Sequence, residues 1–131
     1  MMIMMRRKII PALMAAGTVF AMSATALAAT YPYNVNVPGF GGTALTATRS
    51  ATGNRQMIQA TYIGGGYSGD IYANITSNGT NHLSSSNVEL YTNGVKNYLD
   101  TSAKVGERIQ GLFWTAFYIP VTVQMQGYWS P

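Results

Sequence analysis

The chain offers few side chains suited to acid–base or nucleophilic chemistry. Its 131 residues include one histidine, His82, four carboxylates and no cysteine. A Ser-His-Asp triad would need His82 beside Asp70 or Asp100, and a serine held on a sharp turn. Residues 66–70 approach the motif that holds a hydrolase nucleophile, but Asp70 stands where that motif has glycine and no helix pattern follows. We therefore predict no catalytic residue and expect His82 to lie exposed in a polar loop.

The carboxylates are too dispersed to predict a metal site. Asp70, Glu89, Asp100 and Glu107 span 38 residues, with one histidine and no thiol beside them. Two of them would form a glycosidase pair only if folding brought them within about 5–9 Å. The run 64–70 lacks the Lys-Ser/Thr of a P-loop and the repeated aspartates of calcium-binding repeats. We expect no metal and no cofactor, and we expect this run to form a hairpin tip.

Aromatic side chains are the remaining candidates for function. The chain contains nine tyrosines and two tryptophans, and exposed Tyr or Trp can stack on sugar rings, enter a membrane interface or anchor a protein partner. Aromatic residues also fill the cores of small β proteins, which is the role expected for Phe113, Phe117 and one tryptophan. As candidates for surface recognition we predict Tyr91, Tyr98, Trp114, Tyr118 and Trp129.

The N-terminal segment has the organisation of a secretory signal peptide. A basic cluster at residues 6–8 precedes an apolar stretch at 9–22 and a run of small residues at 23–29. As a helix, the apolar stretch would reach about 21 Å, short of the ~30 Å hydrocarbon core, which favours cleavage over a retained anchor. We predict a signal peptide at 1–28, cleaved between Ala28 and Thr30, and a secreted protein that meets the membrane only transiently during export.

Removal of that segment changes the charge argument. The whole chain carries a net charge of +4, which would favour nucleic acid or an anionic surface as a partner. Beyond residue 28, five Lys or Arg face four Asp or Glu, so the net charge falls to +1. A nearly neutral domain with scattered cations is a poor phosphate binder, and we therefore expect no nucleic-acid partner.

The elements that must position these side chains are predicted to be strands. Residues 29–131 are rich in Asn, Thr, Ser and Gly, and alternating apolar segments recur between turn signals. We predict one all-β domain over 29–131, a small antiparallel β-sandwich of about eight strands. A jelly roll is one of several strand orders that fit the pattern. The expected strands lie at 33–37, 43–49, 56–63, 71–76, 88–92, 95–99, 111–119 and 121–126.

A hairpin is predicted around Asn93 and Gly94, because this dipeptide suits the positive φ angles of a type I′ turn. With a two-residue loop, Val88, Leu90 and Leu99 would lie on the core face. Tyr91 and Tyr98 would then point to solvent together, from the two strands of one hairpin.

The C-terminal segment carries a resemblance to a known group of proteins. Val123 is followed by Gly127, Tyr128 and Trp129. With the predicted leader and the polar β body, this ending resembles small secreted proteins of Gram-positive bacteria that are grouped as a domain of unknown function. The resemblance implies export and a β fold, and it transfers no functional residue.

These observations favour a secreted, non-catalytic protein that acts by surface recognition. Its partner would be cell-wall glycan, another extracellular protein or a second copy of itself, and the sequence leaves the oligomeric state open. One alternative is a bacteriocin-like toxin that contacts the envelope of competing bacteria through the apolar segment 111–123. Another is a small secreted hydrolase that uses His82 or a pair of carboxylates.

Overall fold

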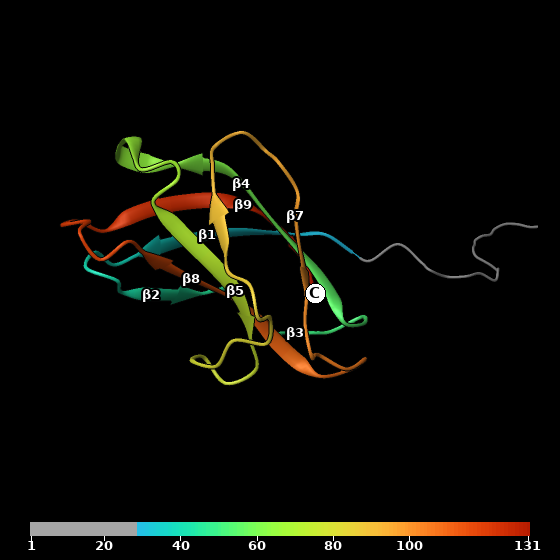
Figure 1. Ribbon diagram of the computed structural model, residues 1–131. Coiled ribbons are helices and arrows are strands. Elements are labelled where there is room, and N and C mark those ends of the chain that lie inside the picture. The colour runs from blue at the N-terminus through green and yellow to red at the C-terminus, as the bar shows by residue number, and fades with distance from the viewer. Residues whose placement is uncertain (1–28) are drawn as a thin grey trace, which may run out of the picture.

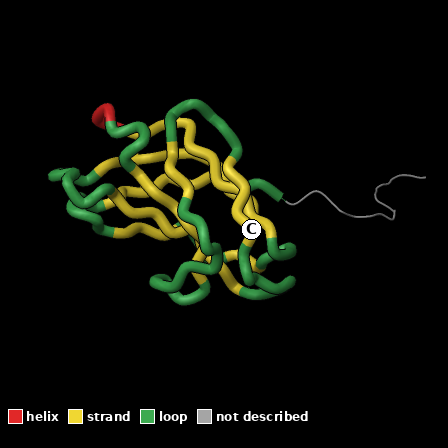
Figure 2. The backbone as a smooth tube through the Cα atoms, in the orientation of Figure 1, coloured by secondary structure: helices red, strands yellow, loops and turns green. Residues whose placement is uncertain are grey.

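The computed structural model describes residues 29–131, so the predicted signal peptide at 1–28 lies outside the described residues. The described chain forms two antiparallel β-sheets packed face to face (Figure 1). Apart from one 3-10 turn, η1 at Gly64–Gly66, this part of the chain consists of strands and loops (Figure 2). It contains no helix long and apolar enough to cross a membrane. The predicted all-β sandwich is confirmed.

The strands are shared between a four-stranded and a five-stranded sheet. The first sheet has the order β1-β9-β4-β7, and the second has the order β2-β8-β5-β6, with β3 also paired to β8. The first sheet comprises β1 (Tyr31–Val37), β9 (Val123–Ser130), β4 (Arg55–Ile63) and β7 (Asn97–Asp100). The second comprises β2 (Thr43–Leu45), β3 (Arg49–Ser50), β8 (Arg108–Thr115), β5 (Ile71–Thr76) and β6 (Val88–Leu90).

This strand order is that of a jelly roll. The predicted strand at 43–49 is interrupted and appears as β2 and β3, which both pair with β8. Counted as one strand, they leave eight strands whose first and last members are neighbours in one sheet. In residues 29–131, six of the seven connections between these strands therefore pass from one sheet to the other, and only β5 and β6 are consecutive strands paired as a hairpin.

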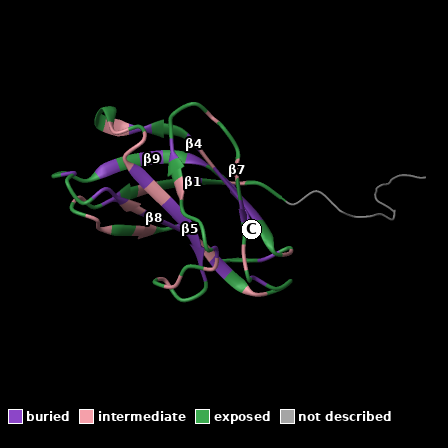
Figure 3. Ribbon diagram, viewed as in Figure 1, coloured by how far each residue is buried: buried purple, intermediate pink, exposed green. Residues whose placement is uncertain are grey.

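The core lies between the two sheets, whose inward side chains are buried (Figure 3). Phe113 of β8 meets Tyr33 of β1 across the sandwich, with ring centroids 4.8 Å apart. The Tyr33 hydroxyl donates to the Gln59 carbonyl at 2.8 Å, and burial raises the pKa of Tyr33 well above its ordinary value. Trp129 of β9 is 1% exposed and belongs to the same core. The core thus joins both sheets through aromatic side chains.

The predicted hairpin around Asn93 and Gly94 is wrong. Strand β6 pairs with β5 in the second sheet, whereas β7 pairs with β4 in the first. Leu90 and Leu99 are both buried, as the alternation predicts, but they reach the core from opposite sheets. The segment between them crosses the edge of the sandwich, and Gly94 takes a positive φ of 70° while its N–H donates to Ala60. The predicted positive φ is therefore correct for Gly94 but not for Asn93, and the turn connects two sheets.

The predicted strand at 111–119 ends earlier, and this changes the place of Phe117. Strand β8 stops at Thr115, where the Ala116 N–H donates to the Asp70 carbonyl and the chain turns. A second bond, from the Ile119 N–H to the Ala116 carbonyl, closes that turn ahead of Pro120. Phe117 is consequently 81% exposed. The expectation that it packs in the core is corrected.

Candidate ligand-binding face

The outer surface of the second sheet carries a row of side chains from four adjacent strands. Thr43 of β2 is in register with Trp114 of β8, which is in register with Tyr72 of β5 and through it with Glu89 of β6. Partners directly opposite each other in a sheet share a face and lie close together. The strand order therefore places two aromatic rings between a hydroxyl and a carboxylate.

Three rings form a stack on this surface. The ring centroids of Tyr72 and Trp114 are 6.1 Å apart with their planes 28° from parallel. The His82 ring lies 5.0 Å from the Trp114 ring at 24°. Trp114 and Tyr72 are each partly exposed, and His82 is exposed. We call the surface formed by Tyr72, His82, Glu89, Tyr91 and Trp114 the aromatic face.

His82 reaches Trp114 because hydrogen bonds hold the loop at 77–87 against the second sheet. Asn74 of β5 is fully buried, and its amide nitrogen donates to the Ser84 carbonyl at 3.1 Å and to Asn87 Oδ1 at 2.8 Å. Its amide oxygen accepts from the N–H of Ser84 at 3.1 Å. One buried side chain of β5 therefore holds the returning half of the loop, and this loop carries His82 to the aromatic face.

A pocket of about 460 Å³ opens between this loop and the sheet. Its walls combine the indole of Trp114 and the side chain of Leu112 with hydroxyl, amide and imidazole groups. Binding sites for small polar ligands have this mixture of apolar surface and a few polar groups. The lining residues are Thr43, Gly79, Thr80, His82, Asn87, Leu112 and Trp114.

Glu89 lies on the aromatic face and Asp70 lies beside it, and each of these carboxylates accepts a hydrogen bond from a tyrosine. The Tyr91 hydroxyl donates to Glu89 Oε1 at 3.0 Å, and the Tyr118 hydroxyl donates to Asp70 Oδ1 at 2.6 Å. The bond to Asp70 raises the pKa of Tyr118 to about 12, and the bond to Glu89 raises the pKa of Tyr91.

Among residues 29–131, neither of these carboxylates forms an ion pair with a cation. Within residues 29–131 the one ion pair is Arg55 with Asp100, at 3.8 Å, and this pair belongs to strands β4 and β7 of the other sheet. The aromatic face is therefore locally acidic, although the domain as a whole is nearly neutral.

The structure brings together three of the five predicted surface aromatics. Tyr91 and Tyr118 are 46% and 69% exposed, and with the partly exposed Trp114 they lie on or beside the aromatic face. Tyr91 is hydrogen-bonded to Glu89, and Tyr118 is hydrogen-bonded to Asp70.

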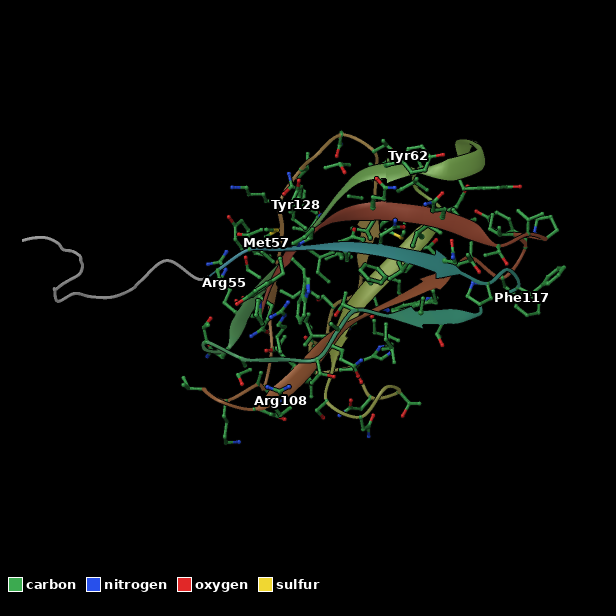
Figure 4. The ribbon with its side chains drawn as sticks, turned by 180° about the vertical axis from the view of Figure 1, so that it is seen from behind. Arg55, Met57, Tyr62, Arg108, Phe117 and Tyr128 are labelled. Atoms are coloured by element: carbon green, nitrogen blue, oxygen red, sulfur yellow. The ribbon has the colours of Figure 1, made fainter. Side chains whose placement is uncertain are left out.

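Tyr98 is exposed as predicted, but it lies on the opposite sheet. The Arg55 guanidinium covers its ring at 4.8 Å from the centroid, and Arg55, which is labelled in Figure 4, belongs to β4 of the first sheet. The expected pairing of Tyr91 and Tyr98 on one face is wrong because β6 and β7 belong to different sheets.

Trp129 does not belong to a surface. It follows Val123 and Met125 on the inward face of β9, and its side chain is 1% exposed. A Cβ at Gly127 would lie 1.9 Å from the Gln59 carbonyl oxygen, so the glycine lets β9 approach β4 at this point. The assignment of Trp129 to a binding site is corrected: it is a core residue.

The groups considered for catalysis have separate partners. The Ser68 hydroxyl accepts a hydrogen bond from the Thr92 N–H at 2.9 Å. Asp70 accepts from Tyr118, while His82 stacks on Trp114. In the part of the chain that the structure describes, no three His, Asp or Glu side chains gather as metal ligands do.

Sequence reasoning missed Tyr72, Asn74 and the position of His82. Tyr72 alternates with the buried Ile71 and Ala73, so its outward direction is visible in the sequence. Its neighbour Trp114 is 42 positions away, and only the β5–β8 register brings the two together. Asn74 occupies a strand position next to a Ser- and Asn-rich loop, and its role depends on the loop folding back.

Comparison of the chain with protein-family models, with curated proteins and with solved structures found no match. The functional argument therefore depends on the geometry of the aromatic face.

Proposed function

We propose that the protein is exported and binds a neutral glycan through the aromatic face, without changing it chemically. The observation that carries the proposal is the stack of Tyr72, Trp114 and His82 beside a pocket lined by polar groups. Export is supported by the leader-like segment at 1–28 and by the resemblance to small secreted proteins of Gram-positive bacteria.

The chemistry of the face suits a sugar. A sugar ring presents C–H groups to an aromatic side chain and hydroxyl groups to hydrogen-bonding partners around it. The stacked rings supply the aromatic surface, and Thr43, Thr80 and Asn87 line the pocket beside them with polar groups. The Glu89 carboxylate at the end of the aromatic row is an acceptor for a further hydroxyl.

The charge of the face selects among glycans. Glu89 and Asp70 bring negative charge to this surface without a neighbouring cation among the described residues. A polymer that carries phosphate groups along its backbone would be repelled there. We therefore propose neutral or amino-sugar segments of a cell-wall glycan as the ligand.

The test is co-sedimentation of the purified protein with insoluble peptidoglycan. The Trp114→Ala variant should bind at least tenfold more weakly, because it removes the centre of the stack. Tyr98→Ala is the matched control, since Tyr98 is an exposed aromatic on the opposite sheet. Absence of binding by the unaltered protein, or equal binding by the Trp114→Ala variant, would contradict the proposal.

A second assay separates binding from hydrolysis. If the protein only binds, prolonged incubation with peptidoglycan should release no new reducing ends. Release that disappears in the Glu89→Gln or His82→Ala variant would instead favour the small hydrolase considered above. Both side chains lie on the aromatic face, so this assay examines the same surface.

A further inference from the structure

Four large side chains protrude together at one end of the sandwich. They come from the loop at 38–42 and the loop at 116–122, which a hydrogen bond from the Phe40 N–H to the Ile119 carbonyl joins at 2.7 Å. Figure 4 shows Phe117 at the end of the molecule opposite Arg55. We call these side chains the apolar tip: Phe40 is 64% exposed, Phe117 81%, Tyr118 69% and Val121 47%.

We propose that the apolar tip inserts into the interfacial layer of a lipid bilayer and anchors the protein reversibly to a membrane surface. This goes beyond the proposed glycan binding and uses a different surface. Aromatic side chains favour the boundary between headgroups and acyl chains, where an apolar ring and a polar edge both find suitable surroundings. Tyr118 has this character, with its hydroxyl bonded to Asp70 at the rim of the tip.

The tip contains no charged side chain. Neither 38–42 nor 116–122 includes Asp, Glu, Lys or Arg. Entry of these two loops into the interface would therefore carry no charge of their own into a medium of low dielectric constant, and the Asp70 carboxylate would stay at the rim, at the level of the headgroups. For the same reason, attraction to the membrane would not depend on anionic lipid.

The backbone of the tip satisfies much of its own hydrogen-bonding capacity, as a segment in lipid must. The N–H groups of Gly41 and Gly42 donate to Thr115 Oγ1 at 3.0 Å and to the Gly39 carbonyl at 3.0 Å. Pro38 and Pro120 have no N–H to satisfy. Three further donors bond within the protein, those of Phe40, Ala116 and Ile119.

Phe40 is held outward by an unusual backbone conformation. Its φ is 56°, and it is the one non-glycine residue with positive φ among residues 29–131. A bulky residue is disfavoured there, so the conformation needs support from its surroundings. Gly39 provides it by packing so closely that a Cβ would lie 2.6 Å from the Ile119 carbonyl oxygen. A strained aromatic kept in solvent is better explained by a partner than by folding.

The area of the tip favours a membrane over a protein partner. From its exposed fractions, and with about 150–250 Å² for a whole aromatic side chain, the tip presents about 500 Å². A stable interface between two proteins buries about 800 Å² on each partner. The tip alone is too small for such an interface, whereas a reversible interfacial anchor needs only a few apolar side chains.

The experiment is co-sedimentation of residues 29–131, which contain both sheets and their shared core, with phosphatidylcholine vesicles. A second set of vesicles contains phosphatidylglycerol in addition. We expect similar binding to both sets, little affected by salt. Phe117→Ser should weaken binding by roughly tenfold, since it removes most of one aromatic side chain's apolar burial. Val105→Ser is the matched control, because Val105 is 79% exposed and precedes β8, whose other end leads into the tip.

Phe40→Gly distinguishes binding from folding. Glycine accepts the positive φ without strain, so this variant should keep or raise the melting temperature while binding vesicles more weakly.

Binding that both substitutions leave unchanged would overturn the proposal, as would failure to bind either set of vesicles. Salt-sensitive binding to phosphatidylglycerol alone would overturn it in favour of the cationic side chains. Self-association abolished by Phe117→Ser, without vesicle binding, would assign the tip to a second copy of the chain. Because the vesicles contain no glycan, these outcomes are independent of peptidoglycan binding.

Discussion

Asp70 and Glu89 are each accompanied by a tyrosine hydroxyl. Tyr118 donates to Asp70 at 2.6 Å, and Tyr91 donates to Glu89 at 3.0 Å. A phenol that donates to a carboxylate loses this bond on ionisation, so its neutral form is favoured. The two tyrosines therefore remain neutral donors at physiological pH, and they orient the carboxylates without cancelling their charge.

The Tyr118 contact gives a prediction at the scale of single residues. The hydrogen bond to Asp70 raises the pKa of Tyr118 from 10.0 to about 12, so the contact is intact below pH 10 and is lost as the pH rises through about 12. Asp70→Asn should lower the pKa of Tyr118 towards 10.0, measurable from the tyrosine Cζ chemical shift by NMR. The Glu89→Gln variant is the control and should shift mainly Tyr91. Unchanged titration of Tyr118 in the Asp70→Asn variant would show that the contact is absent in solution.

At the scale of elements, the loop at 77–87 completes the aromatic face. Leu83 extends the attachment made by Asn74, because its N–H donates to the Ile75 carbonyl at 2.8 Å. The outer part of the loop is organised locally, with Asn78 Oδ1 accepting from the N–H groups of Thr80 and Asn81 at 2.9 and 2.8 Å. The attachment to β5 and the shape of the loop therefore depend on different side chains.

This division predicts different effects for two asparagine substitutions. Asn74→Ala removes the partners of buried polar groups in Ser84 and should lower the free energy of unfolding by about 1–3 kcal/mol. It should also speed amide exchange at Leu83 and Ser84 and weaken peptidoglycan binding, because His82 loses its support. Asn78→Ala is the control: it changes only the exposed part of the loop and should leave exchange at Ser84 unaffected. Urea unfolding and hydrogen exchange by NMR measure both effects.

At the scale of the whole molecule, the jelly-roll topology places the candidate functional surfaces on different parts of the protein. The second sheet carries the acidic aromatic face, while Arg55 and Tyr98 lie on the first sheet. The loops at 38–42 and 116–122 meet at one end, next to the Tyr118–Asp70 contact that borders the aromatic face. A protein anchored by the apolar tip would therefore hold the aromatic face close to the membrane surface.

The two tryptophans test this division of roles. Trp129→Ala removes a side chain that is 1% exposed from the core, and it should cost about 3–5 kcal/mol and shift the whole unfolding transition. Trp114→Ala removes a partly exposed ring and should cost less than about 1.5 kcal/mol. Chemical denaturation followed by far-UV circular dichroism measures both without depending on tryptophan fluorescence. Equal destabilisation by the two substitutions would contradict the assignment of Trp114 to the surface.

Much of the fold was accessible from alternation in the sequence. The direction of side chains in β9 follows from Val123 and Met125, and extending the same period by four residues places Trp129 in the core. The outward directions of Tyr91 and Tyr98 were correct for the same reason. Strand β4 does not follow this alternation along its whole length, because a bulge between Ala60 and Tyr62 leaves the Tyr62 side chain exposed to solvent.

The sequence by itself determined the all-β class, the approximate number of strands and, for most strands, which side chains share a face, because a strand has a period of two residues. Tertiary structure alone decided which strands are neighbours. The Asn93-Gly94 dipeptide has the same local conformational preferences whether it forms a hairpin within one sheet or connects a strand of one sheet to a strand of the other. In the folded protein Leu90 and Leu99 are buried from opposite sheets, although a hairpin would also have buried both. The aromatic face depends on which strands are neighbours, since its rings come from β5, from β8 and from a loop, and these meet only when β5 pairs with β8 in the second sheet.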